Sequence, residues 1–279
     1  MITSQDKELY QQNGYAVVRG VFSEEECADF RSHYMKLRAD GPKPGDMVAD
    51  TQKAGDPLKS FPRMIHMHRW DETSLKWVLD PRLEECLTEF LGSEPLAVQT
   101  MVYFKPAGAR GQALHQDNFY LRAQPGTCMA AWLALDPCDE DNGCMRIVPG
   151  SHEWPILCTE EADTAASFTN VTVPVPEGVE AVPVIMEAGD VLFFNGSVVH
   201  GSYPNLSEDR FRRALIGHYI ESRAERVTEF DQPVLRMDGT AFEIEGAKEG
   251  GACGVWVDNH GKPEIEFVGR QLISSAGHE

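Results

Sequence analysis

The sequence predicts a mainly β protein with flanking α-helices, and two observations carry this prediction. From residue 96 onwards, short apolar runs rich in β-branched and aromatic residues recur at 96–104, 128–135, 144–148, 181–186, 191–195, 211–220, 253–257 and 264–268. Turn residues separate these runs, as in Asp141-Asn142-Gly143 and Gly189-Asp190. Many short strands with such turns are typical of a β-sandwich or a barrel.

The first 95 residues follow a helical pattern instead. A polar helix is expected over 4–13, and Ser23 with Glu26 three residues later forms a capping-box signature for a second helix. Residues 75–91 have helical periodicity that is interrupted at Pro81. We therefore predict one domain over 1–279, with a mainly helical N-terminal cover at 1–95, a β core at 96–220 and a C-terminal extension at 221–279.

The composition restricts the classes of partner. The chain of 279 residues has a formal net charge of -19, which argues against nucleic acid and anionic membranes as partners. No apolar stretch approaches the length of a membrane span, and the N-terminus lacks the apolar segment of a signal peptide. The seven cysteines are odd in number and form no CxxC pair, which favours free thiols in a reducing compartment. We therefore expect a cytoplasmic protein.

The strongest candidate for chemistry is His115-Gln116-Asp117 together with His200, 85 residues further on. Residues i and i+2 of an extended strand share one face, so His115 and Asp117 can reach the same ion. Two imidazoles and a carboxylate are the facial ligand set of Fe(II), which leaves three positions open for a co-substrate and O2. A surface His-x-Asp pair and a buried structural histidine are the alternative interpretations.

Several stretches carry a family resemblance that covers roughly residues 10 to 220. They are Phe104-Lys-Pro-Ala-Gly, Leu114-His-Gln-Asp-Asn-Phe-Tyr, Ala131-Trp-Leu-Ala-Leu-Asp, Asn142-Gly-Cys-Met-Arg-Ile-Val-Pro-Gly-Ser-His152, Gly189-Asp-Val-Leu-Phe-Phe, His200-Gly-Ser-Tyr-Pro-Asn-Leu-Ser and Phe211-Arg-Arg-Ala. In this order they resemble the phytanoyl-CoA dioxygenase family of Fe(II)/2-oxoglutarate oxygenases. The resemblance implies a double-stranded β-helix, which is a jelly-roll, cupin-like barrel with iron inside one mouth.

The same resemblance implies how 2-oxoglutarate is held. Arg212 matches the arginine that binds the C5 carboxylate, and a bidentate guanidinium suits a planar carboxylate. The segment before this arginine is one residue longer than usual, so Arg213 and Arg210 remain alternatives. Ser202, Lys105, Gln116 and Trp132 match family positions around the co-substrate or its anchoring shell.

The resemblance also implies the reaction. Relatives that halogenate replace the carboxylate at the position of Asp117 by a small residue, so its presence favours hydroxylation, with release of succinate and CO2. We expect a small, polar metabolite as the substrate. The candidate substrate residues are Tyr103, Asn118, Tyr120, Arg63, His66 and Asn195. The long segment 153–180 is a candidate lid.

Two other classes of function remain open at this point. A cupin-like metal-dependent isomerase or lyase would use the same barrel and ligands without 2-oxoglutarate. A non-catalytic metal-binding barrel would not turn over any substrate. A homodimer also stays open, because nothing in the sequence decides the oligomeric state.

Overall fold

The computed structural model describes residues 2–48, 55–247 and 251–271, and its centre is two facing β-sheets. The major sheet has the order β1-β11-β6-β13-β4-β15-β16, with β3 paired to β4 and β2 paired to β3. The minor sheet has the order β10-β7-β12-β5. This arrangement is the double-stranded β-helix, so the predicted jelly-roll fold class is confirmed.

The strand bounds show how the two sheets alternate along the chain. The major sheet consists of β1 (Tyr15–Val18), β2 (Asp46–Met47), β3 (Arg63–Ile65), β4 (Pro95–Lys105), β6 (Cys128–Ala134), β11 (Val191–Asn195), β13 (Arg212–Glu221), β15 (Val234–Arg236) and β16 (Ala241–Phe242). The minor sheet consists of β5 (Gln112–His115), β7 (Met145–Ile147), β10 (Val182–Val184) and β12 (His200–Ser202). Within the predicted β core, the chain therefore passes repeatedly from one sheet to the other.

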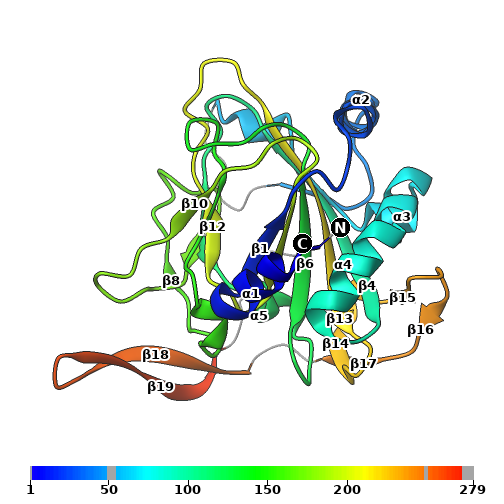
Figure 1. Ribbon diagram of the computed structural model, residues 1–279. Helices are drawn as coiled ribbons and strands as arrows, with labels where there is room; N and C mark the ends of the chain where they lie inside the picture. Colours follow the sequence, from blue (N-terminus) through cyan, green and yellow to red (C-terminus); the bar gives the residue numbers. More distant parts are fainter. Residues whose placement is uncertain (1, 49–54, 248–250, 272–279) are drawn as a thin grey trace.

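Four helices cover the outer face of the major sheet: α1 (Ser4–Asn13), α2 (Glu24–Ala39), α3 (Glu72–Val78) and α4 (Pro81–Leu91). The predicted capping box of α2 is present, because Ser23 accepts from the backbone of Glu26 and the Glu26 side chain accepts from the backbone of Ser23. The predicted interruption at Pro81 separates α3 from α4, which both pack against β4 (Figure 1). Their buried side chains, including Trp77, meet the outward residues of the sheet in one apolar cluster.

A second apolar cluster fills the space between the two sheets. Its members from the major sheet include Met101, Trp132, Phe194 and Ile216, and those from the minor sheet include Met145. All seven residues of β6 are buried because this strand has helices on one face and the minor sheet on the other. The inner face of the major sheet is therefore dry, and any polar group on it must find a partner within the barrel.

The remaining short elements connect and flank the sheets. They are α5 (Asn118–Leu121), η1 (Pro57–Lys59), η2 (Met67–Arg69), η3 (Ser151–Glu153), η4 (Glu229–Asp231), β8 (Glu160–Glu161), β9 (Val171–Thr172), β14 (Arg226–Thr228) and β17 (Glu245–Ala247). The candidate lid 153–180 contains the β8–β9 pair, and the backbone of Val173 donates to the carbonyl oxygen of Leu114 in β5. Whether this segment moves stays a prediction. No helix in the described ranges is long and apolar enough to cross a membrane.

The C-terminal extension ends in a hairpin that projects from the barrel, β18 (Gly251–Asn259) with β19 (Lys262–Gln271) (Figure 1). A disulfide between Cys158 and Cys253 fastens its base to the candidate lid, and Trp154 packs edge-on against Trp256 beside it. The expectation that all seven cysteines are free thiols is therefore wrong for this pair. The two partners are 95 residues apart, so the sequence spacing gave no sign of the pairing.

We expect loss of this disulfide to destabilise the oxidised protein without changing the barrel. In Cys253→Ser the free energy of unfolding should fall by about 2–4 kcal/mol, because the cross-link no longer restricts the unfolded chain. Urea unfolding of both proteins without reductant measures the difference, which should disappear when dithiothreitol is added. Seven alkylated cysteines in denatured, unreduced wild-type protein would contradict the pairing.

Candidate metal centre

The three candidate ligands come together where β5 and β12, two neighbouring strands of the minor sheet, pair. His115 ends β5 and His200 begins β12, and the two residues are direct cross-strand partners with ring centroids 4.2 Å apart. Asp117 lies beyond the end of β5, with φ -62° and ψ -37°, at the start of α5. The same-strand argument for His115 and Asp117 is therefore wrong in its detail, since a turn and not strand alternation directs the carboxylate to the two imidazoles.

The distances between the ligand atoms suit a single ion. Oδ1 of Asp117 lies 3.5 Å from Nε2 of His115 and 3.6 Å from Nε2 of His200. All three ligand atoms lie within 4.8 Å of one another, and they form the one group of this kind in the described residues. One atom at the centre of this triangle would be reached by two nitrogens and one oxygen, which is a facial set.

The backbone fixes the orientation of both imidazoles. Nδ1 of His115 donates to the carbonyl oxygen of Ala113 at 3.0 Å, and Nδ1 of His200 donates to that of Val198 at 3.0 Å. A neutral imidazole that donates through Nδ1 has its lone pair on Nε2. Both lone pairs therefore face Asp117, and each histidine has the carbonyl partner that is typical of metal-ligating histidines.

The protonation states also suit a cation. Burial, together with the nearby ring of His115, lowers the pKa of His200 to about 4. Burial by itself would raise the pKa of Asp117, but the imidazoles of His200 and His218 outweigh it and hold that pKa well below its usual value. Near neutral pH the centre therefore offers a neutral His200 and a carboxylate, which are the forms that bind a metal ion.

A cavity opens beside the three ligands. Its wall consists of Met101, Tyr103, Gln112, His115, Asp117, Trp132, Met145, Phe194, His200, Ser202, Arg212, Ile216 and His218. Most of these side chains come from the inner face of the major sheet, so the metal ligands and the sheet face each other across the cavity.

Arg212 is the charged residue of the cavity that has no acid partner in the described structure. It is 2% exposed, its guanidinium carbon lies 5.4 Å from the ring of Trp132, and its Nε donates to the carbonyl oxygen of Gly143 at 3.1 Å. Nη1 is buried and has no hydrogen-bond partner among the described residues. A buried guanidinium in this state is a ready site for an anion, above all for a planar carboxylate.

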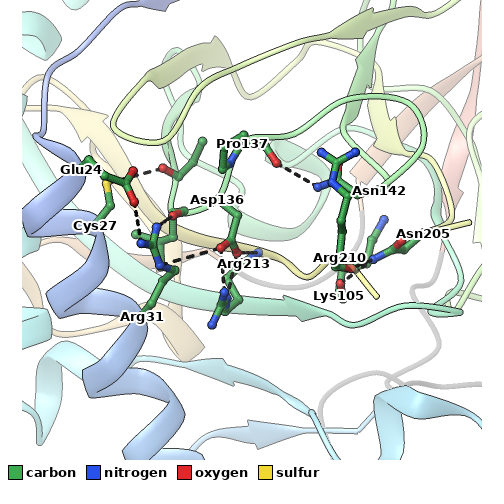
Figure 2. A network of polar contacts seen from close by, with 12 residues as sticks. Glu24, Cys27, Arg31, Lys105, Asp136, Pro137, Asn142, Asn205, Arg210 and Arg213 are labelled. Atoms are coloured by element: carbon green, nitrogen blue, oxygen red, sulfur yellow. Dashed lines mark hydrogen bonds and ion pairs between the residues drawn. The ribbon is translucent and has the colours of Figure 1, made fainter. Parts of the chain in front are cut away.

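Arg213 and Arg210, the two alternatives to Arg212, are engaged elsewhere. Arg213 makes a bidentate pair with Asp136 at 2.7 and 2.8 Å, and Figure 2 shows it beside Arg31 in a network outside the cavity. Arg210 pairs with Asp139 at 2.9 Å. Neither residue lines the cavity. The geometry therefore favours Arg212 as the carboxylate-binding arginine.

Lys105 and Ser202 lie next to this arginine. Nζ of Lys105, which is buried, donates to Oγ of Ser202 at 2.8 Å and to the carbonyl oxygens of Gly143 and Tyr203. Burial, followed by the positive charge of Arg212, lowers the pKa of Lys105 well below its ordinary value. An anion placed between the two cations would relieve this cost. Gly143 has φ +85°, and a Cβ there would lie 2.7 Å from Lys105 Cδ, so glycine keeps this corner open.

Gln116 does not line the cavity, contrary to the role that the resemblance implied. Its Nε2 donates to the carbonyl oxygens of Ser197 and Pro155 at 2.8 and 3.1 Å, and its Oε1 accepts from the backbone of Leu157 at 2.8 Å. All three contacts lead away from the metal ligands, because residues 115 and 117 point the other way. Gln116 therefore fastens the start of the candidate lid to the ligand strand.

The candidate substrate residues fall into two groups. Tyr103 lines the cavity, and Arg63 lies beside it, with Nη1 3.3 Å from the Tyr103 hydroxyl. The other four do not line it. The side chains of Asn118 and Asn195 accept hydrogen bonds from nearby backbone. Tyr120 packs in an outer apolar cluster, with its ring 6.4 Å from that of His115. His66 pairs with Asp231 at 2.8 Å.

Two polar residues of the cavity were not predicted. Nε2 of His218 lies 3.1 Å from Oδ2 of Asp117, and Nε2 of Gln112 lies 3.2 Å from Nε2 of His115. Strand alternation along β13 places His218 on the same face as Arg212. Nothing in that pattern indicated that a turn would bring Asp117 to this face, so the contact could not be inferred.

Comparison with known proteins now identifies the family. The model of the family described as phytanoyl-CoA dioxygenase (PhyH) matches residues 10–214. The chain belongs to this family. Among curated relatives, it is 25% identical to the peroxisomal phytanoyl-CoA dioxygenase of Rattus norvegicus over 236 residues, which is 80% of this chain and 69% of the rat protein. It is 30% identical to phytanoyl-CoA dioxygenase 1 of Oryza sativa over 160 residues, or 56% of each chain.

Solved structures show the same fold at lower identity. The epimerase SnoN from nogalamycin biosynthesis, solved with Fe3+, α-ketoglutarate and nogalamycin RO, has a TM-score of 0.66 at 22% identity, over 79% of this chain and 84% of SnoN. The carbocyclase SnoK has a TM-score of 0.66 at 22% identity, over 80% of this chain and 86% of SnoK. The first of these carries iron and 2-oxoglutarate on this fold.

Members of the PhyH family depend on Fe(II), 2-oxoglutarate and O2, and the residues of this chain fit these groups. The three converging ligand atoms suit Fe(II). The unpartnered nitrogen of Arg212, with Lys105 next to it, suits the distal carboxylate of 2-oxoglutarate. The chain is therefore a member of the Fe(II)/2-oxoglutarate oxygenase superfamily that acts on a small molecule.

We expect Arg212→Ala to weaken binding of 2-oxoglutarate by about tenfold or more, because a charge-assisted hydrogen bond to a carboxylate contributes about 1.5–3 kcal/mol. Anaerobic titration of the Fe(II)-loaded protein, followed by the visible charge-transfer band of the chelate, measures the dissociation constant. Arg210→Ala, which removes a half-exposed arginine two residues earlier, is the matched control and should leave this constant unchanged. Equal constants for both variants would contradict the assignment of Arg212.

Proposed function

We propose that this protein is an Fe(II)/2-oxoglutarate-dependent dioxygenase that hydroxylates a C–H bond of a small, polar metabolite and releases succinate and CO2. One observation carries the proposal. The facial ligand set His115, Asp117 and His200 shares a single buried cavity with Arg212, whose buried Nη1 has no partner in the described structure. An isomerase or lyase that works without 2-oxoglutarate does not need a carboxylate-binding guanidinium at this place.

The bound iron, with 2-oxoglutarate and O2, supplies the oxidising chemistry, and the chain supplies position and a dry environment. Arg212 holds the distal carboxylate of the co-substrate, and Lys105 with Ser202 adds positive charge and a hydroxyl beside it. The apolar wall of Met101, Met145, Phe194 and Ile216 keeps water away from the reacting atoms. Trp132 forms the wall next to the guanidinium.

The substrate is proposed to enter from the side of Tyr103. This residue also lines a second cavity, whose other walls are Met47, Leu58, Phe61, Pro62, Arg63, Phe104, Lys105 and Phe168. The wall is mainly apolar and aromatic, with the guanidinium of Arg63 placed over the rings of Tyr103 and Phe168. It suits a compact molecule with an apolar body and one polar or anionic group. The net charge of -19 disfavours a polyanionic CoA ester.

The type of oxidation has to be argued from the site itself. SnoN and SnoK show that the fold also serves an epimerase and a carbocyclase, so the fold does not decide the reaction. Hydroxylation rests on the carboxylate of Asp117, which occupies the ligand position that halogenating relatives leave open. It also rests on the family of oxygenases to which the chain belongs.

The experiment that tests the proposal is a substrate screen under 18O2. The iron-loaded protein should form succinate with one class of small metabolite and incorporate one 18O atom into its product. His200→Ala should form neither, because the metal loses one of three protein ligands. Succinate formation with a product that carries no 18O would contradict hydroxylation and support epimerisation, cyclisation or desaturation.

Location and assembly are further predictions. We propose a cytoplasmic location, which the five free, buried cysteines in the described residues favour and the Cys158–Cys253 disulfide disfavours. A Cys158–Cys253 disulfide that persists in freshly quenched cells would contradict this location. A monomer and a homodimer both remain open, and light scattering of the purified protein distinguishes them.

A further inference from the structure

We propose that His218 is a positioning residue for the metal centre, which holds Asp117 as a ligand through one oxygen only. His218 lies on β13, six residues after Arg212 on the same inner face, and it is 4% exposed. Its Nε2 lies 3.1 Å from Oδ2 of Asp117. The other oxygen of this carboxylate, Oδ1, is the one that faces Nε2 of both His115 and His200.

The direction of this hydrogen bond follows from its partners. A carboxylate that ligates a metal ion is deprotonated, and it only accepts hydrogen bonds. Nε2 of His218 must therefore carry the proton and donate it to Oδ2. Nδ1 of the same ring is buried and has no partner in the described parts of the chain, so no acceptor is present for a second proton. In this contact Nε2 of His218 is therefore the donor and Oδ2 of Asp117 the acceptor.

The polar residues next to His218 are hydrogen-bonded to other groups and not to its ring. Gln99 is its cross-strand partner on β4, but the Gln99 amide donates to Asp231 at 2.7 Å. Nε2 of His66 lies 2.8 Å from the same oxygen of Asp231. Asp117 is therefore the one group to which the His218 ring is hydrogen-bonded among the described residues.

A fourth-ligand role for His218 is the alternative, and the geometry disfavours it. The nitrogens of His218 lie outside the group of ligand atoms that converge within 4.8 Å. Its Nε2 faces the oxygen that points away from the other two ligands. A hydrogen bond on Oδ2 prevents the carboxylate from chelating the ion with both oxygens. This leaves three positions of an octahedral ion free, which the proposed function needs for 2-oxoglutarate and O2.

The first test measures metal binding without any turnover. We expect His218→Leu to weaken Co(II) binding by about 10-fold or more, as loss of an outer partner of a ligand does. His218→Gln, whose amide nitrogen can reach Oδ2 from the same backbone position, should bind within threefold of wild type. Met186→Leu, a volume-conserving change of a buried apolar residue that does not line the cavity, is the matched control and should bind as wild type does.

The visible spectrum of bound Co(II) reports the coordination of the ion, and it would not change if His218 only stabilised the fold. Wild type and His218→Gln should share one spectrum, and His218→Leu should differ because Oδ2 is released. Unchanged affinity and spectrum in His218→Leu would overturn the proposal. Equal loss in a folded His218→Gln would overturn it as well, since the hydrogen bond would then not be the cause.

A measurement on wild-type protein avoids any variant that fails to fold. Long-range 15N–1H correlation spectra of the Zn(II)-loaded protein distinguish the two histidine tautomers. The proposal expects a protonated, metal-free Nε2 at His218, whereas an unprotonated or metal-bound Nε2 would overturn it. None of these readouts involves 2-oxoglutarate, so the proposal on His218 can fail or hold independently of hydroxylation.

Discussion

The pairing of β5 with β12 is the constraint on which the site depends. It places His115 directly opposite His200, and the carbonyl oxygens of residues 113 and 198 then orient both rings in the same way. A shift of one residue in this register would turn one imidazole to the other face of the sheet and remove it from the ion. The register has an irregularity between His200 and Ser202, which brings Gln112 opposite Ser202. The pairing therefore determines the wall of the cavity as well as the ligands.

The interior of the barrel holds opposite charges that do not neutralise each other. Asp117 is surrounded by imidazoles at one side of the cavity, while Arg212 and Lys105 lie close together in the same region of the fold without a carboxylate partner among the described residues. Buried charges of this kind are costly unless they are paired. A divalent cation at the first site and a dicarboxylate that bridges to the second would satisfy both, so the protein is electrostatically prepared for two bound groups together.

Much of the fold and of the candidate site could be predicted because the sequence patterns that specify them are local. Strand alternation and turns predicted the β core. The motif around Arg212 also favoured it over its neighbours as the carboxylate-binding residue. The physical reason for this choice is visible only in the structure, where Arg213 and Arg210 are engaged in ion pairs. Gln116 was misjudged because a motif position does not say which way a side chain points once the chain turns. Contacts between distant segments, such as Cys158 with Cys253 and His66 with Asp231, depend on packing that no short pattern encodes.

Some of the charged groups in this cavity are common on this fold, and others are particular to this chain. In the proposed function the ligands and Arg212 serve the metal and the co-substrate, and the epimerase SnoN was solved with iron and α-ketoglutarate as well. The outcome of the oxidation depends on where the substrate lies relative to the open metal positions, and Tyr103 and Arg63 lie on the side from which it can approach. If His218 holds Asp117 to one oxygen, the number of open positions is set by β13, the strand that also carries Arg212. A single strand would then control both the binding of the co-substrate and the geometry available to O2.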